Sequence, residues 1–282
     1  MEVIQDIENV VKAVNQLKDA GEKIALVPTM GNLHDGHISL VKEALKYARK
    51  VVVSIFVNPL QFNNQNDLQT YPRTLQQDLE KLKEAGVAIV FTPTPEVMYP
   101  QGLDNQTFVE VPGISSRLEG ALRPGHFRGV ATVVNKLFNI VRPDYAMFGQ
   151  KDFQQVAMLR QMIRDLSLQI TLVEVPIVRD EKGLALSSRN GLLTEENKSR
   201  AHLLHREMMN LSEKIRNGDR DFAKLKQETW KNLDNCGFKT DAVDIVDADT
   251  LLDISPKTRK AVILLAAYLG TPRLIDNTTV DL

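Results

Sequence analysis

The segment IALVPTMGNLHDGHISLV, residues 24–41, joins two different patterns of apolar residues. Residues 24–27 are an unbroken apolar run ahead of Pro28, which predicts a short buried strand over residues 23–29. Residues 37–49 carry apolar side chains at helical spacing and predict an amphipathic helix. A strand that leads through a glycine-containing turn into a helix is the first half of a βαβ unit. This segment therefore predicts an α/β fold.

The chain repeats this alternation up to about residue 176. Further strands are expected at 51–57, 87–91, 144–149 and 170–178, with another candidate at 107–111, and helices at 4–17, 74–85, 130–141 and 153–165. Residues 58–72 and 119–129 are expected to be loops. Near-continuous apolar strands separated by helices predict a Rossmann-like parallel sheet with helices on both faces.

The pattern changes after Pro176. Long charged amphipathic helices are expected at 195–216 and 222–235, and strands at 242–248 and 261–269. We therefore expect two domains: a Rossmann-like domain over residues 1–176, and a smaller α+β domain over residues 177–282.

The composition excludes several classes of protein. The chain of 282 residues is 43% hydrophobic and 25% charged, so it can bury a core, and its net charge of -1 gives no basic excess for a nucleic-acid surface. No uncharged run approaches the roughly 18 residues of a membrane span, and the first residues do not resemble a signal peptide. The lone cysteine, Cys236, cannot form a disulfide within the chain and fits the reducing cytosol. We expect a cytoplasmic protein that binds neither nucleic acid nor a membrane.

Two histidines and two glycines lie where the first strand meets its helix. Gly31 allows a sharp turn, and Gly36 lets a ligand approach the backbone closely. His34 and His37 are three residues apart, so within a first helical turn they share a face. Their ring N–H groups and the backbone N–H groups of a helix N-terminus then converge on one anion, which predicts a cradle for a nucleotide phosphate. The alternative is an incidental pair of surface histidines.

Neither common phosphate-binding fingerprint is present around these histidines. The dinucleotide motif G-x-G-x-x-G is absent, and no G-K-[ST] follows the glycines as it does in a P-loop.

Three more polar clusters follow, two at predicted strand ends and one just past the domain boundary. In FGQKDFQQ, residues 148–155, Lys151 suits a phosphate and Asp152 a helix cap or a ribose. In LALSSRNGLLT, residues 184–194, two serines and an arginine suit a leaving polyphosphate, and in NPLQF Gln61 suits a small hydroxy acid. The alternatives are a capped helix start with a solvated lysine and ordinary polar loops.

Taken together, these clusters resemble one family. VPTMGNLHDGH, SIFVNPLQF, YPRT, LEGALRPGHFRGV, FGQKDFQQ and LALSSRN occur in this order, and their combination is similar to that of the pantothenate synthetase (pantoate–β-alanine ligase) family. The resemblance covers nearly the whole chain. One part, the H-x-G-H motif at residues 34–37, is shared with the wider nucleotidyltransferase superfamily.

The resemblance implies a reaction. Enzymes of this family join pantoate to β-alanine with ATP and Mg²⁺: the pantoate carboxylate attacks the α-phosphorus, giving a pantoyl adenylate and pyrophosphate, and the β-alanine amine then displaces AMP. The resemblance also implies a homodimer, and it makes the first domain the one that binds nucleotide and pantoate and the second a lid.

The resemblance also implies site residues. ATP is expected to contact Met30, Gly31, Asn32, Leu33, His34, Asp35, Gly36, His37, Gly149, Gln150, Lys151, Asp152, Val178, Leu186, Ser187, Ser188 and Arg189. Catalysis is expected to involve His34, His37, Lys151, Ser187, Ser188 and Arg189, with His37 as the proton donor. Gln61 and Gln155 are expected to hold pantoate. Asp78, the acidic candidate after YPRT, is the expected Mg²⁺ ligand, although the ion can also be held by phosphates and water.

Other functions use the same motifs. A nucleotidyltransferase that keeps the nucleotide on its product needs the same histidines. A nucleotide-binding protein without turnover is expected to have lost a histidine or Lys151, and all three are present. A structural protein has no use for three polar clusters at strand ends.

Overall fold

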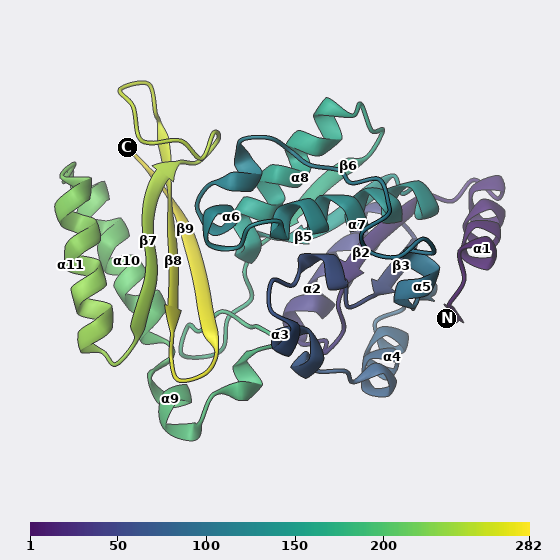
Figure 1. Cartoon of the computed structure of the whole chain (residues 1–282), viewed down its shortest axis with the longest axis horizontal. Helices are drawn as coiled ribbons and strands as arrows, with labels where there is room; N and C mark the ends of the chain where they lie inside the picture. The colour runs from purple at the N-terminus through teal and green to yellow at the C-terminus, as the bar shows by residue number, and fades with distance from the viewer. The chain divides into compact units, whose positions relative to one another are not determined.

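The chain divides into two compact units, Met1–Pro176 and Ile177–Leu282 (Figure 1). They are seen in a computed structural model that describes all 282 residues apart from the side chain of Gln65. We call them unit 1 and unit 2 and describe each by itself.

Unit 1 is built on a six-stranded parallel sheet. Its strands are β1 (Glu2–Ile4), β2 (Ile24–Thr29), β3 (Lys50–Ile55), β4 (Ile89–Phe91), β5 (Tyr145–Gly149) and β6 (Thr171–Val175). Their order across the sheet is β1-β4-β3-β2-β5-β6. The chain runs outward from β2 through β3 to β4 and then crosses back to β5 on the other side of β2. In open α/β sheets such a reversal places a ligand crevice at the carboxyl ends of the two central strands.

Helices cover both faces of this sheet, as predicted. On one face α2 (Asp35–Tyr47) and α4 (Leu75–Glu84) pack against inward side chains such as Val27 and Val53. On the other face lie α1 (Ile7–Asp19), α7 (His126–Val141) and α8 (Phe153–Asp165) (Figure 1). Because successive strand residues point to opposite faces, double coverage requires unbroken apolar runs, which explains the fully buried VVV of β3.

Several short elements were not expected. The predicted loops contain η1 (Pro59–Gln61), α3 (Gln65–Thr70) and α6 (Glu119–Leu122), and η2 (Ile114–Ser116), η3 (Gln150–Asp152) and α5 (Pro95–Met98) complete unit 1. α7 begins at His126, inside a predicted loop, because Gly125 takes the left-handed conformation that starts it. The first helix begins three residues later than predicted, at Ile7, and Ile4 is the last residue of edge strand β1.

The strand expected at residues 107–111 is absent, and that prediction was wrong. The backbone N–H of Val109 donates to Oγ1 of Thr132 on α7, at 3.0 Å, in place of a neighbouring strand. The Thr132 side chain of α7 thus accepts the hydrogen bond that a neighbouring strand would accept in a sheet.

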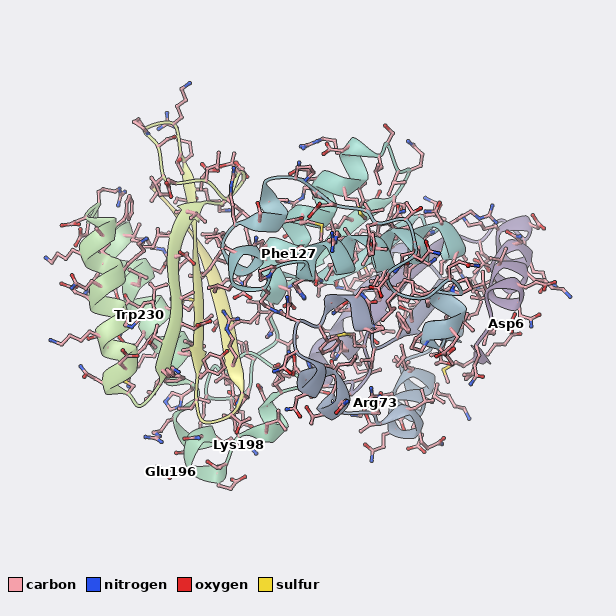
Figure 2. The ribbon with its side chains drawn as sticks, in the orientation of Figure 1. Asp6, Arg73, Phe127, Glu196, Lys198 and Trp230 are labelled. Atoms are coloured by element: carbon pink, nitrogen blue, oxygen red, sulfur yellow. The ribbon has the colours of Figure 1, made fainter. Side chains whose placement is uncertain are left out.

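Unit 2 is a three-stranded antiparallel sheet backed by helices (Figure 1). Its elements are η4 (Asn190–Leu192), α9 (Glu195–Arg200), α10 (Leu203–Arg216), α11 (Phe222–Asn235), β7 (Lys239–Asp247), β8 (Lys260–Tyr268) and β9 (Arg273–Asp281). Apolar side chains of α10 and α11, such as Met208 and Leu233, pack with those of the sheet. The helix expected at 195–216 is two helices, and β9 was not predicted. Trp230 lies on α11 (Figure 2).

Within the described part of the chain, the helices are all too short or too polar to cross a membrane.

Candidate functional site

His34 and His37 form the cap of α2. His34 is the N-cap residue, and its Nδ1 accepts a hydrogen bond from the N–H of Gly36 at 3.1 Å. The Nδ1 of His37 accepts from the N–H of His34 at 3.3 Å. The ring centroids are 4.2 Å apart. The two imidazoles therefore lie side by side, as their spacing predicts, and they also take the places of the serine and glutamate of a common capping box.

The surroundings keep both rings neutral. Burial, and then the charge of Lys151, lower the pKa of His34 to about 4. Burial, the neighbouring His34 and then Lys151 lower the pKa of His37 to about 3. In a neutral imidazole whose Nδ1 accepts a hydrogen bond, the proton is on Nε2. Each ring thus has one N–H donor for a ligand, at Nε2.

One detail of the predicted anion cradle needs correction. The free backbone N–H groups at the helix N-terminus were expected to converge on the anion with the rings, but those of His34 and Gly36 donate to the two Nδ1 atoms. The Nε2–H groups of both rings are donors for an anion, and they lie at the positive end of the helix dipole.

The loop before α2, which we call loop 30–34, has a left-handed turn. Gly31 has φ of +84° and Asn32 of +51°. A Cβ on Gly31 would lie 3.1 Å from Cγ2 of Ile55 and 3.2 Å from Oδ2 of Asp78, which explains this glycine both sterically and conformationally. Asp35 is exposed at the first position of α2, and Leu33 is buried in the core below the loop.

Asp78, the predicted Mg²⁺ ligand, is buried against this loop. Its Oδ2 accepts from the N–H of Asn32 at 2.9 Å, and its Oδ1 accepts from the N–H of Leu33 at 2.8 Å and from the hydroxyl of Thr74 at 3.2 Å. Lys81, one turn further along α4, donates to the carbonyl of Leu33 at 2.6 Å. Metal ligation by Asp78 stays a prediction.

The residues after β5 approach the histidines. β5 pairs with β2 in parallel, so Gly149 and Thr29 end neighbouring strands at the same edge. η3 follows with Gln150, Lys151 and Asp152, and the charge of Lys151 acts on both imidazoles. The structure therefore brings Lys151 to the histidine pair, as the sequence predicts.

Gln61 follows β3, the strand next to β2, and both ends of its side-chain amide make a contact. Its Nε2 contacts Sδ of Met30 at 3.1 Å, and its Oε1 accepts from Nδ2 of Asn58 at 3.1 Å. Asn58 in turn accepts from the hydroxyl of Tyr99 at 2.7 Å, and burial raises the pKa of that hydroxyl, which keeps it a donor. This chain of contacts fixes which end of the Gln61 amide faces loop 30–34.

The two adjacent glutamines of α8 differ in their surroundings. Gln154 is buried, and its Nε2 donates to the carbonyls of Ile114 and Arg117 at 2.8 Å each, so it holds that segment in place. Gln155, the residue expected to hold pantoate, is half-buried.

Sequence patterns did not identify Asn58, Tyr99 or Lys81. The short spacing between Asn58 and Gln61 was the only local signal, because Tyr99 and Lys81 act on residues more than 40 positions away.

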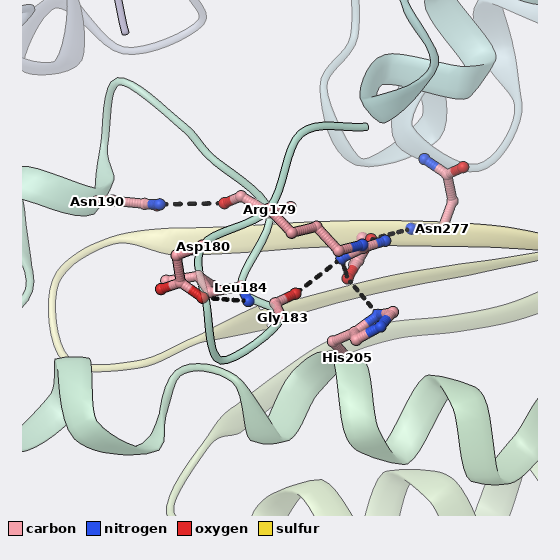
Figure 3. A network of polar contacts seen from close by, with 9 residues as sticks. Arg179, Asp180, Gly183, Leu184, Asn190, His205 and Asn277 are labelled. Atoms are coloured by element: carbon pink, nitrogen blue, oxygen red, sulfur yellow. Dashed lines mark hydrogen bonds and ion pairs between the residues drawn. The ribbon is translucent and has the colours of Figure 1, made fainter. Parts of the chain in front are cut away.

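The other predicted nucleotide residues belong to a hairpin of unit 2, residues 178–189 (Figure 3). The N–H of Leu186 donates to the carbonyl of Val178 at 2.9 Å, and the turn is closed by Asp180, whose Oδ1 accepts from the N–H of Leu184. Ser187, Ser188 and Arg189 follow directly, all half-buried, and the hydroxyl of Ser187 accepts from the N–H of Arg189 at 3.2 Å.

An ion pair between a half-buried arginine and a buried aspartate holds this hairpin within unit 2. Arg179 makes two contacts with Asp276 of β9, NH1 to Oδ2 at 2.6 Å and NH2 to Oδ1 at 2.8 Å, and it donates to the carbonyl of Gly183 (Figure 3). Nδ1 of His205 lies 3.4 Å from Oδ2 of Asp276. Gly183 has φ of +100°, and a Cβ there would lie 2.9 Å from the His205 ring.

Comparisons with known proteins agree on one family. A family model described as pantoate-beta-alanine ligase matches residues 2–279. The chain is 55% identical over 282 residues to a pantothenate synthetase of Vibrio parahaemolyticus, covering 100% of this chain and 94% of that protein. It is 58% identical over 269 residues to one of Aeromonas hydrophila, covering 95% and 94%.

Solved structures give the same result. The crystal structure of pantothenate synthetase from Thermus thermophilus matches with a TM-score of 0.91 and 41% identity, over 99% of each chain. A pantoate-beta-alanine ligase from Francisella tularensis, solved with beta-gamma ATP and beta-alanine, matches with a TM-score of 0.83 and 38% identity, over 99% of this chain and 97% of that one.

Proposed function

The chain belongs to the pantoate–β-alanine ligase family, and we propose that loop 30–34, the first turn of α2 and the ends of β3 and β5 form its adenylation site. The enzyme is a ligase that condenses pantoate with β-alanine to pantothenate, using ATP, through a pantoyl adenylate, and releasing AMP and pyrophosphate. The observation that carries the assignment of the site is the pair of neutral imidazoles beside Lys151, each with its proton on Nε2.

In the first step the pantoate carboxylate attacks the α-phosphorus of ATP, and pyrophosphate leaves. Negative charge grows on the phosphoryl oxygens in the transition state. We assign the Nε2–H groups of His34 and His37, with the ammonium of Lys151, to stabilise this charge. Donors that are already oriented need no rearrangement during the reaction, and removing one such donor typically lowers kcat by about 10²–10³-fold.

We propose a narrower role for His37 than the expected one of proton donor. With a pKa of about 3 the ring is neutral near pH 7, and its Nδ1 is occupied by the N–H of His34. His37 therefore acts in this proposal through a hydrogen bond from Nε2–H, and not as an imidazolium acid in the free enzyme.

We assign Gln61 and Gln155 to pantoate. The support for Gln61 is its fixed orientation: Oε1 is held by Asn58, so the Nε2 end of the amide is directed toward Met30 in loop 30–34. An amide NH₂ in this orientation is a donor for the oxygen atoms of a small hydroxy acid. Gln155 is proposed from its place on α8, in the first turn after Lys151 and Asp152.

In the second step the β-alanine amine attacks the acyl carbon, and AMP leaves. An acyl adenylate hydrolyses readily, so water must be excluded until the amine arrives. We propose that unit 2 acts as a lid for this purpose, with Ser187, Ser188 and Arg189 contacting the nucleotide phosphates. The support is chemical, because two hydroxyls and a guanidinium follow a hairpin that Arg179 joins to Asp276.

Mg²⁺ enters the proposal only as a partner of the nucleotide phosphates. We do not assign Asp78 to a protein-held metal site, because both of its oxygens accept hydrogen bonds from loop 30–34 and Oδ1 also accepts one from Thr74. Among the described side chains there is no group of three His, Cys, Asp or Glu that could bind a metal ion. Mg²⁺ commonly binds phosphates and keeps several waters.

A homodimer and a cytoplasmic location complete the proposal. The dimer is supported by the family resemblance. The location is supported by the single cysteine, Cys236, which is a free thiol at the end of α11.

The reaction is tested by following AMP and pyrophosphate with ATP, Mg²⁺ and pantoate, with and without β-alanine. Steady AMP release is expected only when β-alanine is present, and without it we expect about one pyrophosphate per site. Steady AMP release without β-alanine, or a nucleotide that stays on the product, would contradict the proposal. The second outcome would identify a nucleotidyltransferase.

A further inference from the structure

Side chains at the start of α4 bind the backbone of loop 30–34. Asp78 is 1% exposed, and each of its oxygens accepts from a backbone N–H of the loop, that of Asn32 at 2.9 Å and that of Leu33 at 2.8 Å. Thr74, the N-cap of α4, adds its hydroxyl to Oδ1 at 3.2 Å. Buried N–H groups of a loop need such an acceptor, because they have no strand or helix partner.

Lys81 also binds the loop backbone, from the same face of α4 as Asp78. Residues 78 and 81 are three apart on the helix and so lie on one side of it. The ammonium of Lys81 donates to the carbonyl of Leu33 at 2.6 Å. The two polar backbone groups of Leu33 are thus bound by two side chains of one helix, and His34 is the next residue.

The loop conformation needs this support. Gly31 and Asn32 both have positive φ, and the left-handed region costs about 1–2 kcal/mol for a residue with a side chain. Asn32 is the non-glycine residue of this turn, and Asp78 accepts the hydrogen bond from its N–H. Oδ2 of Asp78 also lies where a Cβ on Gly31 would be only 3.2 Å away, so the carboxylate fits closely under the turn.

These contacts leave Asp78 poorly suited to a metal ion. Oδ1 has two donors, and Oδ2 is pressed against the Gly31–Asn32 turn. Lys81 beside it is a cation, and a lysine ammonium has no lone pair for a metal.

We propose that Asp78 and Lys81 are positioning residues, which set the place of the His34 and His37 imidazoles by fixing loop 30–34 through its backbone. The proposal rests on the proposed function in one respect, that these imidazoles are the groups that act on the nucleotide. Lys81 adds a smaller effect, because its charge helps to lower the pKa of both histidines.

The test uses two changes on α4 and two matched controls. Asp78→Asn keeps the shape but places an NH₂ against a backbone N–H, and Lys81→Met keeps the length but removes the donor. Glu84→Gln and Lys83→Met are the same kinds of change at exposed positions of the same helix. Each is measured alone and in a His34→Ala/His37→Ala background, with kcat, KM for ATP and the Mg²⁺ concentration for half-maximal rate.

We expect Asp78→Asn to lower kcat by about 100-fold, as a misplacement near 1 Å can, and Lys81→Met to lower it less. The controls are expected to stay within about twofold of the parent, in line with the small effects of most surface changes. In the histidine-free background, Asp78→Asn and Lys81→Met are expected to have little further effect, because residues that act as a unit are not additive. The Mg²⁺ requirement is expected to be unchanged.

Equal losses in both backgrounds would overturn the proposal, as would an Asp78→Asn enzyme that excess Mg²⁺ restores. Lys81→Met keeps the test open if Asp78→Asn does not fold, because residue 81 is exposed. If His34→Ala/His37→Ala itself keeps full activity, the proposed function fails, and that result is distinct from a failure of the positioning role.

Discussion

Loop 30–34 of unit 1 and hairpin 178–189 of unit 2 are both held by a buried aspartate, but through different chemistry. Asp78 accepts hydrogen bonds from the backbone of a left-handed turn. Asp276 pairs with the side chain of Arg179, which in turn binds the carbonyl of Gly183. In the first case the aspartate fixes the path of the backbone itself, and in the second it fixes a side chain that spans the hairpin.

This difference has consequences for substitution. A pair of side chains can be replaced together by apolar residues of similar volume, because both charges then disappear. Backbone N–H groups cannot be removed in this way, so the loss of Asp78 always leaves two donors in need of a partner. We therefore expect the hairpin to tolerate replacement of both Arg179 and Asp276 by apolar residues. No corresponding replacement exists for loop 30–34.

The largest expected effect on stability follows from breaking the ion pair. In Arg179→Met, Asp276 is left buried without its cation, and we expect a loss of about 3 kcal/mol, the lower end for such a change, since Arg179 is partly exposed. Urea unfolding followed by the fluorescence of Trp230 measures this loss, because that residue is the single tryptophan of the chain and lies in unit 2 (Figure 2).

The double variant Arg179→Met/Asp276→Leu sharpens the result. It is expected to recover a large part of the lost stability, although the N–H of Asn277 loses its contact with Asp276. An unchanged midpoint for Arg179→Met, or a double variant as unstable as Asp276→Leu and Arg179→Met combined, would contradict the account of the hairpin.

A smaller effect is expected at Gly31, for which Gly21 is the matched control. Both have positive φ, +84° and +77°, but a Cβ on Gly21 meets nothing within 4 Å, whereas one on Gly31 meets Ile55 and Asp78. We expect each Gly→Ala change to cost about 1–2 kcal/mol for the left-handed backbone. Only Gly31→Ala is expected to lower kcat as well, roughly 10–100-fold, because it displaces the carboxylate below the loop.

Calorimetric unfolding and steady-state kinetics on the two variants provide this comparison. Equal activities for Gly21→Ala and Gly31→Ala would show that the close fit between Asp78 and the loop has no bearing on the reaction.

The parts of the fold that sequence patterns predicted are those with a continuous local signal. β2, α2 and β3 were predicted within a few residues, and α8 and α11 with the same bounds. β9 was missed because RLIDNTTVD places polar residues among its apolar ones, including the buried Asp276 and Asn277. β1 was missed because a three-residue edge strand is too short to show a period.

The site divides along the same line. His34, His37 and Lys151 were found because their motifs lie at strand ends, where parallel strands bring ligand groups together. The capping role of both Nδ1 atoms was not, since it depends on side-chain orientation. The hold by Asp78 and Lys81 was also missed, because it joins residues 45 to 48 positions apart and a helix face shows no sign of the loop it supports.

The central claim is that His34 and His37 are neutral, Nε2-protonated donors, and NMR of the ¹⁵N-labelled histidines tests it directly. The chain has five histidines, so single substitutions can assign the signals. We expect both rings to have the proton on Nε2 at pH 7, to titrate near pH 4 and pH 3, and to shift at Nε2 when a non-hydrolysable ATP analogue binds.

The same pKa values contribute to the pH dependence of stability. Both lie below the unfolded value of 6.5, so between pH 6.5 and about 4 the unfolded chain binds more protons than the native one, and stability is expected to fall as the pH falls through this range. Nε2-protonated rings that stay neutral down to pH 5 would agree with the account. Rings that carry their proton on Nδ1, or that titrate near pH 6.5 in the folded enzyme, would contradict it.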